Sequence, residues 1–190
     1  MENLMDLMLD LETLDTAPTA VVLSIGAVVF DPYGHVMGPP FYVEFTNFLE
    51  QQTAVGRTIS PSTVIWWMGQ DAKARQVFQS KESSPERCSP LWGLHAFADF
   101  LKANPIQNVW AKDPDFDVVI LRSLYQTNAP DLVFPFKYSA GRSVRTIEAM
   151  PFARLRDKPP VAHNALEDAI AQAKAVQEAF ADLRALQERN

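Results

Sequence analysis

Apolar residues alternate with polar ones or run together in three segments near the start of the chain, a pattern typical of β-strands. We expect these strands at residues 5–11, 20–30 and 36–45. The Asp-Pro-Tyr-Gly sequence that separates the second strand from the third has the composition of a tight turn. These two strands are therefore predicted to pair as an antiparallel hairpin. Gly26, inside the second strand, predicts a bulge or a close approach of another backbone.

The rest of the chain is predicted to be mostly helical, and apolar residues recur at the spacing of one helix face in residues 91–101 and, most clearly, in 165–187. The predicted helices cover residues 62–69, 71–79, 91–101, 116–126, 143–150 and 165–187. Ser60 and Pro61 have the residue types of an N-cap and of a first helical position. A short strand is expected at residues 108–111 and another near Phe136, with loops at 81–90 and 151–160.

The composition predicts one globular domain over residues 1–190, because a chain of this length with 47% apolar residues can bury one core but is short for two domains. The first residues lack the basic side chains of a signal peptide, and the longest apolar run is too short to cross a membrane. The lone Cys88 has no partner for an intrachain disulfide, as is typical of the reducing cytoplasm. We therefore expect a cytoplasmic protein that does not enter a membrane.

The net charge of −6 argues against a protein that coats nucleic acid by bulk electrostatic attraction. The charge is unevenly spread, however, because residues 112–158 hold eight Lys or Arg and six acidic residues. A mildly basic wall beside an acidic pocket would suit a polyanion that enters by one end. Ordinary patchiness of a protein surface explains the same distribution.

Two carboxylates stand two positions apart in the first predicted strand. Side chains alternate along a strand, so Asp10 and Glu12 point to one face while Leu9 and Leu11 point to the other. Burying like charges side by side is costly unless a cation stands between them. A divalent metal ion is the usual remedy, although such pairs also occur as exposed charges at the edge of a sheet.

Three more acids, Asp113, Asp115 and Asp117, lie where a predicted strand ends and a helix begins. Ligands of α/β sheets tend to gather at such junctions. Asp115 is well placed to cap the helix, which would set Asp117 in the first turn, facing the pocket. Spacing does not decide which acid is the ligand, but we favour Asp117 over Asp113.

A third cluster opens the last predicted helix. Asn164 and Glu167 have the spacing of a capping box, which makes Asn164 the N-cap and leaves His163 just outside the helix. On a continuous helix His163 and Asp168 would point about 140° apart. From a preceding loop, His163 can turn toward the same centre as Asp168. Taken singly, a surface histidine and a solvated acid in a first helical turn are the ordinary explanations.

Together these residues resemble, in order and spacing, the three motifs of the DEDDh superfamily of 3′-to-5′ exonucleases, which includes RNase T and oligoribonuclease. The residues that carry the resemblance are Asp10-Leu11-Glu12-Thr13, the run from Ser24 to Asp31, Phe116-Asp117 with Ile120-Leu121, and the run from His163 to Asp168. The resemblance implies an α/β, ribonuclease-H-like fold with a mixed central sheet flanked by helices. Trp66-Trp67-x-x-Gln70 and Arg145-Thr146 make the chain most similar to the compact, stand-alone branch of phages and bacteria.

The resemblance implies a phosphodiester hydrolase that removes nucleotides from the 3′ end of single-stranded nucleic acid by a two-metal-ion mechanism. Asp10 would bridge two Mg²⁺ or Mn²⁺ ions. Glu12 and Asp168 would complete the ion that activates water, and Asp117 would hold the other. Carboxylate ligands select such hard ions over zinc. His163 would act as the general base.

The same resemblance implies substrate contacts at Thr13, Leu14, Trp66, Trp67, Gln70 and Arg145. Adjacent tryptophans on a helix diverge by about 100°, so at most one can be buried without the other being partly exposed. The exposed indole could stack on the terminal base, although both indoles could simply pack the helix onto the sheet.

The substrate stays open at the level of sequence. RNA is slightly favoured and single-stranded DNA is the alternative, because discrimination depends on contacts to the 2′-hydroxyl. A non-catalytic module that binds nucleic-acid ends is less expected, since no metal ligand is missing.

The turn at residues 112–115, Lys-Asp-Pro-Asp, departs from the branch, whose members usually have an Asn and small residues before the Phe-Asp pair. A homodimer is compatible with the resemblance, since some relatives form one.

Overall fold

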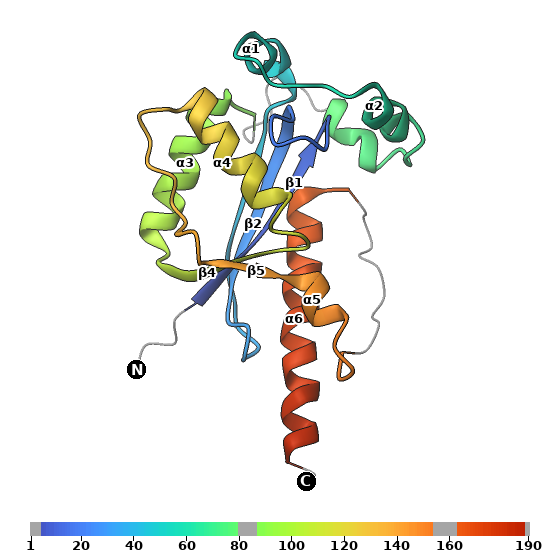
Figure 1. Cartoon of the computed structure of the whole chain (residues 1–190), viewed down its shortest axis with the longest axis vertical. Coiled ribbons are helices and arrows are strands. Elements are labelled where there is room, and N and C mark those ends of the chain that lie inside the picture. The colour runs from blue at the N-terminus through green and yellow to red at the C-terminus, as the bar shows by residue number, and fades with distance from the viewer. Residues whose placement is uncertain (1–4, 80–86, 154–162, 189–190) are drawn as a thin grey trace.

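The computed structural model describes residues 5–79, 87–153 and 163–188, which form a five-stranded mixed sheet flanked by helices (Figure 1). The strands are β1 (Met5–Thr13), β2 (Val22–Phe30), β3 (Met37–Glu44), β4 (Ile106–Ala111) and β5 (Gly141–Ser143). Their order across the sheet is β3-β2-β1-β4-β5. The first three strands pair antiparallel, whereas β1 with β4 and β4 with β5 pair parallel. The predicted hairpin of the second and third strands is confirmed.

Helices cover both faces of the sheet and one end of it (Figure 1). The α-helices are α1 (Leu49–Ala54), α2 (Pro61–Met68), α3 (Pro90–Ala103), α4 (Asp117–Asn128), α5 (Val144–Glu148) and α6 (Ala165–Gln187). The described residues also form two 3₁₀ helices, η1 (Thr46–Phe48) and η2 (Ala74–Phe78). α3 and α4 pack on one face, and α5 and α6 on the other. None of the helices in the described ranges is long and apolar enough to cross a membrane.

Two cores lie on opposite faces of β1. Leu7, Leu9 and Leu11 pack in the core shared with α3 and α4, whereas Met8 packs in the core shared with α5 and α6. Side chains alternate along a strand, so Asp10 and Glu12 share the face of Met8. Strand geometry alone therefore aims both carboxylates toward α6.

Gly26 lies where helix α6 begins. It is opposite Asp10 in the pairing of β1 with β2, and a Cβ atom on Gly26 would lie 2.1 Å from the carbonyl carbon of Ala165. Only a residue without a Cβ allows the two backbones to come so close. The predicted close approach is confirmed, and it holds the start of α6 against the sheet beside Asp10.

Within the segment 71–79, predicted as a helix, only Ala74–Phe78 is helical, and it forms the 3₁₀ helix η2. The Asp71 carboxylate accepts the N–H groups of Lys73 at 2.8 Å and of Ala74 at 2.9 Å, which closes a tight local turn. An aspartate that bonds nearby backbone groups in this way competes with regular α-helix.

The strand predicted near Phe136 is wrong, and the strand of that region is β5, a few residues later. Phe136 is buried as a loop residue in the core shared with α3 and α4, so its apolar character reflects packing rather than strand pairing. The helix predicted from residue 91 begins at Pro90, with Ser89 as its N-cap. Residues 81–86 and 154–160 of the two predicted loops lie outside the described residues.

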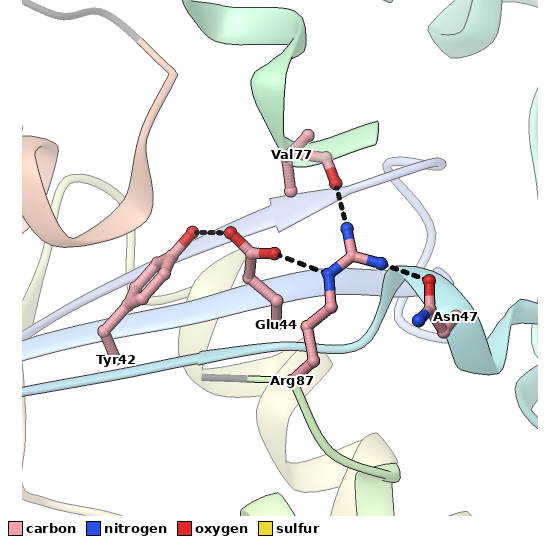
Figure 2. Close-up of polar contacts among 5 residues, drawn as sticks. All are labelled: Tyr42, Glu44, Asn47, Val77 and Arg87. Carbon is pink, nitrogen blue, oxygen red and sulfur yellow. Dashed lines mark hydrogen bonds and ion pairs between the residues drawn. The ribbon is translucent and has the colours of Figure 1, made fainter. Parts of the chain in front are cut away.

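A buried ion pair anchors the edge of the sheet (Figure 2). Arg87 Nε lies 3.2 Å from Glu44 Oε2, and the Tyr42 hydroxyl donates to the other carboxylate oxygen at 2.8 Å. The same guanidinium donates to the carbonyl oxygen of Val77 at 3.2 Å and to the side-chain oxygen of Asn47. Arg87 thereby joins the end of β3 to η1 and η2.

Candidate active site

Five side chains from three separate motifs line one cavity of about 570 Å³. They are Asp10, Glu12, Asp117, His163 and Asp168. The first two stand toward the end of β1, Asp117 opens α4, and the last two flank the start of α6. Distant parts of the sequence therefore meet at one place.

Asp117 is buried in the first turn of α4 and is only 4% exposed. Its Oδ1 accepts the backbone N–H of Leu11 at 3.0 Å, which ties the start of the helix to β1. The N-cap role predicted for Asp115 is wrong, because the N-cap residue is Phe116 and Asp115 is exposed outside the cavity. The carbonyl oxygen of Asp113 instead accepts the N–H groups of Phe116 and Asp117, so a backbone turn starts this helix.

His163 adopts a left-handed backbone conformation, with a φ of 67°. Its N–H donates to Asp168 Oδ2 at 2.8 Å, and the Asn164 side chain caps α6 by accepting the N–H of Glu167 at 3.1 Å. The predicted cap is confirmed, and His163 lies outside the helix as expected. One possible ligand atom each from Glu12, His163 and Asp168 lie within 4.8 Å of one another.

The carboxylates of this cavity repel one another in a buried environment. Burial raises the pKa of Asp10 well above its ordinary value of 3.8, and the charges of Asp117 and Glu12 raise it further. Burial also raises the pKa of Glu12 and of Asp168, and it raises the pKa of Asp117 to about 7. Like charges in such a site are relieved by protons or by cations. An oxygen-rich donor set of this kind fits a hard divalent cation.

Sequence reasoning missed Gln172, which also lines the cavity. Its Nε2 donates to Asp10 Oδ1 at 2.8 Å. Gln172 stands four residues after Asp168 on α6, so the two side chains lie on one face of the helix. The spacing of four residues from Asp168 was the only sequence feature that indicated Gln172. Glutamines are so common on helices that this spacing does not distinguish a functional one.

A second cavity of about 410 Å³ adjoins the first, since Leu11, Glu12 and Phe116 line both. Trp66 and Trp67 of α2 line the second cavity as well. Thr13, Thr16, Ser62 and Thr63 complete its lining.

The two tryptophans differ in exposure, as the helix geometry predicted. Trp67 is 3% exposed and donates from Nε1 to the carbonyl oxygen of Thr13 at 2.8 Å, whereas Trp66 is 46% exposed. The Trp66 ring lies against the His163 ring, with centroids 4.7 Å apart. The exposed indole therefore stands between the acidic cluster and the second cavity.

The structure places the other predicted substrate contacts in different surroundings. Leu14 is buried in the core with Trp67, and it lines neither of the two cavities. Gln70 also lies outside both cavities and donates from Nε2 to the carbonyl oxygen of Trp66 at 2.9 Å. Arg145 lines the first cavity, with Nε 3.8 Å from the Asp113 carboxylate.

The fold is that of solved DEDDh exonucleases. The nuclease domain of 3′hExo, a DEDDh family member bound to rAMP, matches with a TM-score of 0.64 at 10% identity, covering 95% of this chain and 94% of that one. The E. coli ExoI–ssDNA complex matches with a TM-score of 0.60 at 15% identity, covering 93% of this chain and 40% of that one. The predicted ribonuclease-H-like fold with a mixed central sheet is confirmed. DEDDh exonucleases depend on divalent metal ions, in agreement with the acidic cluster described above.

The sequence itself is similar to exonucleases over most of its length. An exodeoxyribonuclease of Enterobacteria phage T4 is 25% identical over 189 residues, covering 87% of this chain and 81% of the phage protein. The 3′-5′ exoribonuclease Rv2179c-like domain matches residues 5–180, a span that includes all three motifs. The chain therefore belongs to the Rv2179c-like family of 3′-5′ exoribonuclease domains, with the DEDDh exonuclease fold.

Proposed function

We propose that residues 1–190 form a single exonuclease domain that removes nucleotides one at a time from the 3′ end of a single-stranded nucleic acid. The observation that carries this proposal is the meeting of the five motif side chains, four carboxylates and one imidazole, in a single cavity. The four carboxylates are those of Asp10, Glu12, Asp117 and Asp168, and the imidazole is that of His163. Four carboxylates balance the charge of two divalent cations, so the net charge of −6 is compatible with a polyanionic substrate.

Two Mg²⁺ or Mn²⁺ ions are the proposed cofactor. Asp10 would bridge both ions. Glu12 and Asp168 would hold one ion, and Asp117 would hold the other. When bound, such ions hold the scissile phosphate and lower the pKa of the attacking water.

His163 is the proposed general base. A histidine exchanges protons near neutral pH, and this imidazole lies beside ligand atoms of Glu12 and Asp168. The hydrogen bond from the His163 N–H to Asp168 fixes the backbone of the base relative to one of the acids. His163 can therefore take a proton from a water molecule that the acidic cluster positions.

The second cavity is the proposed site of the terminal nucleotide. Trp66 would stack on the base, and Thr13 would contact the nucleotide from the same cavity. Trp67 would form part of the same wall, and Leu14 and Gln70 would support it from behind. Arg145 would contact phosphate at the first cavity.

RNA is the substrate that we favour, because the family that matches residues 5–180 is described as exoribonuclease. Single-stranded DNA is the second candidate, favoured by the similarity to the exodeoxyribonuclease of phage T4.

The direct test uses single-stranded RNA and DNA of one sequence, each labelled at the 5′ end. In Mg²⁺ or Mn²⁺ we expect a ladder of products shortened stepwise from the 3′ end, and no products in EDTA. Asp10→Asn should abolish the ladder, and His163→Asn should slow its appearance by about 10²- to 10⁴-fold. Full activity in either variant, or release of nucleotides from the 5′ end, would show that the assignment is wrong.

Cytoplasmic location is a further proposal, supported by the lone Cys88. The homodimer that the resemblance suggests stays a prediction, which light scattering of the purified protein would test.

A further inference from the structure

Gln172 connects helix α6 to the strand that carries the acidic pair. Its Nε2 donates to Asp10 Oδ1 at 2.8 Å, and both residues line the cavity of about 570 Å³. Asp168 stands one turn earlier on the same helix face. The amide therefore reaches the carboxylate of β1 from the helix that also supplies an acid to the cluster.

The hydrogen-bond donors to the carboxylates differ in kind. Asp117 accepts the backbone N–H of Leu11, and Asp168 accepts the backbone N–H of His163. Asp10 instead accepts from a side chain, that of Gln172. A backbone donor is set by the fold, whereas the donor to Asp10 can be removed by one substitution.

Three other acids, Glu12, Asp117 and Asp168, share the cavity with the Asp10 carboxylate, and their negative charges disfavour its charged form. The Gln172 N–H acts against these effects because it stabilises the charged carboxylate. The reverse amide orientation would set two oxygen acceptors 2.8 Å apart. The charged carboxylate therefore requires the N–H end of the amide.

The other end of the amide makes no such bond. Gln172 Oε1 is buried and has no hydrogen-bond partner among the described residues. An unpartnered buried acceptor is unfavourable because it has lost its hydrogen bonds to water. The amide thus donates to Asp10 while its own oxygen has no hydrogen-bond partner among the described residues. A glutamine that only packed its helix against the sheet would not be expected to adopt this arrangement.

We propose that Gln172 is a positioning residue that holds Oδ1 of Asp10 and so presents its other oxygen, Oδ2, to a divalent cation. Within the part of the chain that the structure describes, no protein donor bonds to Oδ2. The inference rests on the proposed function, because the cation site is part of it. Residues that orient a metal ligand in this way typically change metal affinity by about 10- to 100-fold when they are replaced.

The test is calorimetric titration of the full chain with Mn²⁺ alone, without nucleic acid. Gln172→Met keeps the length of the side chain but removes the donor, and we expect Mn²⁺ to bind roughly 10-fold more weakly. Gln172→Asn keeps a polar amide but is one methylene too short, and the same loss is expected. This second variant decides the question if Gln172→Met does not fold by circular dichroism.

Gln177→Met is the matched control on the same helix. Gln177 is also buried and donates from Nε2 to the carbonyl oxygens of Asp31 and Val36, away from the cavity. Its loss should lower the unfolding temperature but leave Mn²⁺ affinity unchanged. Equal losses of affinity in the Gln172 and Gln177 variants would assign the effect to helix packing and overturn the inference.

Asp10→Asn separates this inference from the proposed function. If Asp10→Asn abolishes Mn²⁺ binding while a folded Gln172 variant binds within twofold of the natural protein, only the positioning role is overturned. If Asp10→Asn binds Mn²⁺ as tightly as the natural protein, the proposed metal site itself is wrong.

Discussion

The indole of Trp66 stands edge-on to the imidazole of His163, with ring centroids 4.7 Å apart and ring planes at 82°. Trp66 belongs to α2 and His163 directly precedes the N-cap of α6, so the contact joins the two cavities. Edge-to-face aromatic pairs contribute about 0.5–1.5 kcal/mol beyond the area that they bury. Because Trp66 is also 46% exposed, one side chain can orient the proposed base and still receive a nucleobase.

Trp66→Ala is expected to raise KM for a single-stranded oligonucleotide roughly 10-fold, because base stacking contributes about 1–3 kcal/mol. It should also lower kcat, since His163 loses its aromatic neighbour. Steady-state kinetics on a 5′-labelled oligonucleotide measures both. Trp92→Ala is the control, because Trp92 is exposed on α3 and lines neither cavity. An unchanged KM in Trp66→Ala would exclude the stacking role.

His163→Asn and His163→Ala should separate backbone strain from catalysis. The left-handed conformation at φ 67° costs an ordinary side chain about 1–2 kcal/mol, and asparagine tolerates it better than alanine. We therefore expect the Asn variant to unfold a few degrees above the Ala variant in scanning calorimetry. Both should hydrolyse substrate about 10²- to 10⁴-fold more slowly, as is typical of a lost general base. A near-normal rate in either variant would contradict the role of His163.

Local rules of chain geometry predict most of the acidic site. Alternation along the first strand aims Asp10 and Glu12 at one face, and this depends only on neighbours in the sequence. The Asn164 cap follows from its spacing to Glu167, and it leaves His163 outside the helix. Such features could be predicted because the residues that determine them lie only a few positions apart in the sequence.

Features that depend on tertiary contacts were not predictable in the same way. β5 has three residues, too few to show a period, and it exists because it pairs with β4. Gln172 contacts Asp10 across the space between a helix and the sheet. Leu14 packs beneath Trp67 rather than along a cavity, which nothing in its own neighbourhood indicates.

Metal-free protein is expected to lose stability as the pH rises. Burial raises the pKa of Asp117 from 3.8 to about 7, and the pKa values of Asp10 and Glu12 shift in the same direction. In this window the folded protein binds more protons than the unfolded chain, so the free energy of unfolding falls with increasing pH. The cost of charging these acids is absent below about pH 4 and grows as the pH rises through 7.

Asp10→Asn isolates this effect, because it removes one negative charge from the cluster and keeps an oxygen that can accept from Gln172. In EDTA, we expect its unfolding temperature to exceed that of the natural protein by more at pH 8 than at pH 5. Each 1 kcal/mol corresponds to about 2–4 °C in a chain of this size. A difference that is equal at both pH values would show that charge repulsion does not set the stability of the site.

Mn²⁺ should restore the stability that repulsion removes. We expect Mn²⁺ to raise the unfolding temperature of the natural protein, and to raise it more at pH 8 than at pH 5, because the cation competes with protons for the same oxygens. The increase should vanish in Asp10→Asn. Thermal unfolding followed by circular dichroism, with and without Mn²⁺, measures it. An equal increase in both proteins would place the bound Mn²⁺ elsewhere.

Arg87→Met is expected to destabilise the protein by about 3–5 kcal/mol, because it leaves the buried Glu44 carboxylate without its cation. Glu44→Gln should cost less, since the guanidinium keeps the Val77 carbonyl and the Asn47 side chain as acceptors. The double variant should recover part of the loss, because no unpaired charge remains buried. Denaturant unfolding of the four proteins gives the coupling energy directly. Strictly additive losses of unfolding free energy would show that the pair contributes through packing alone. Exonuclease activity should be unchanged in all variants, because neither Arg87 nor Glu44 lines either cavity.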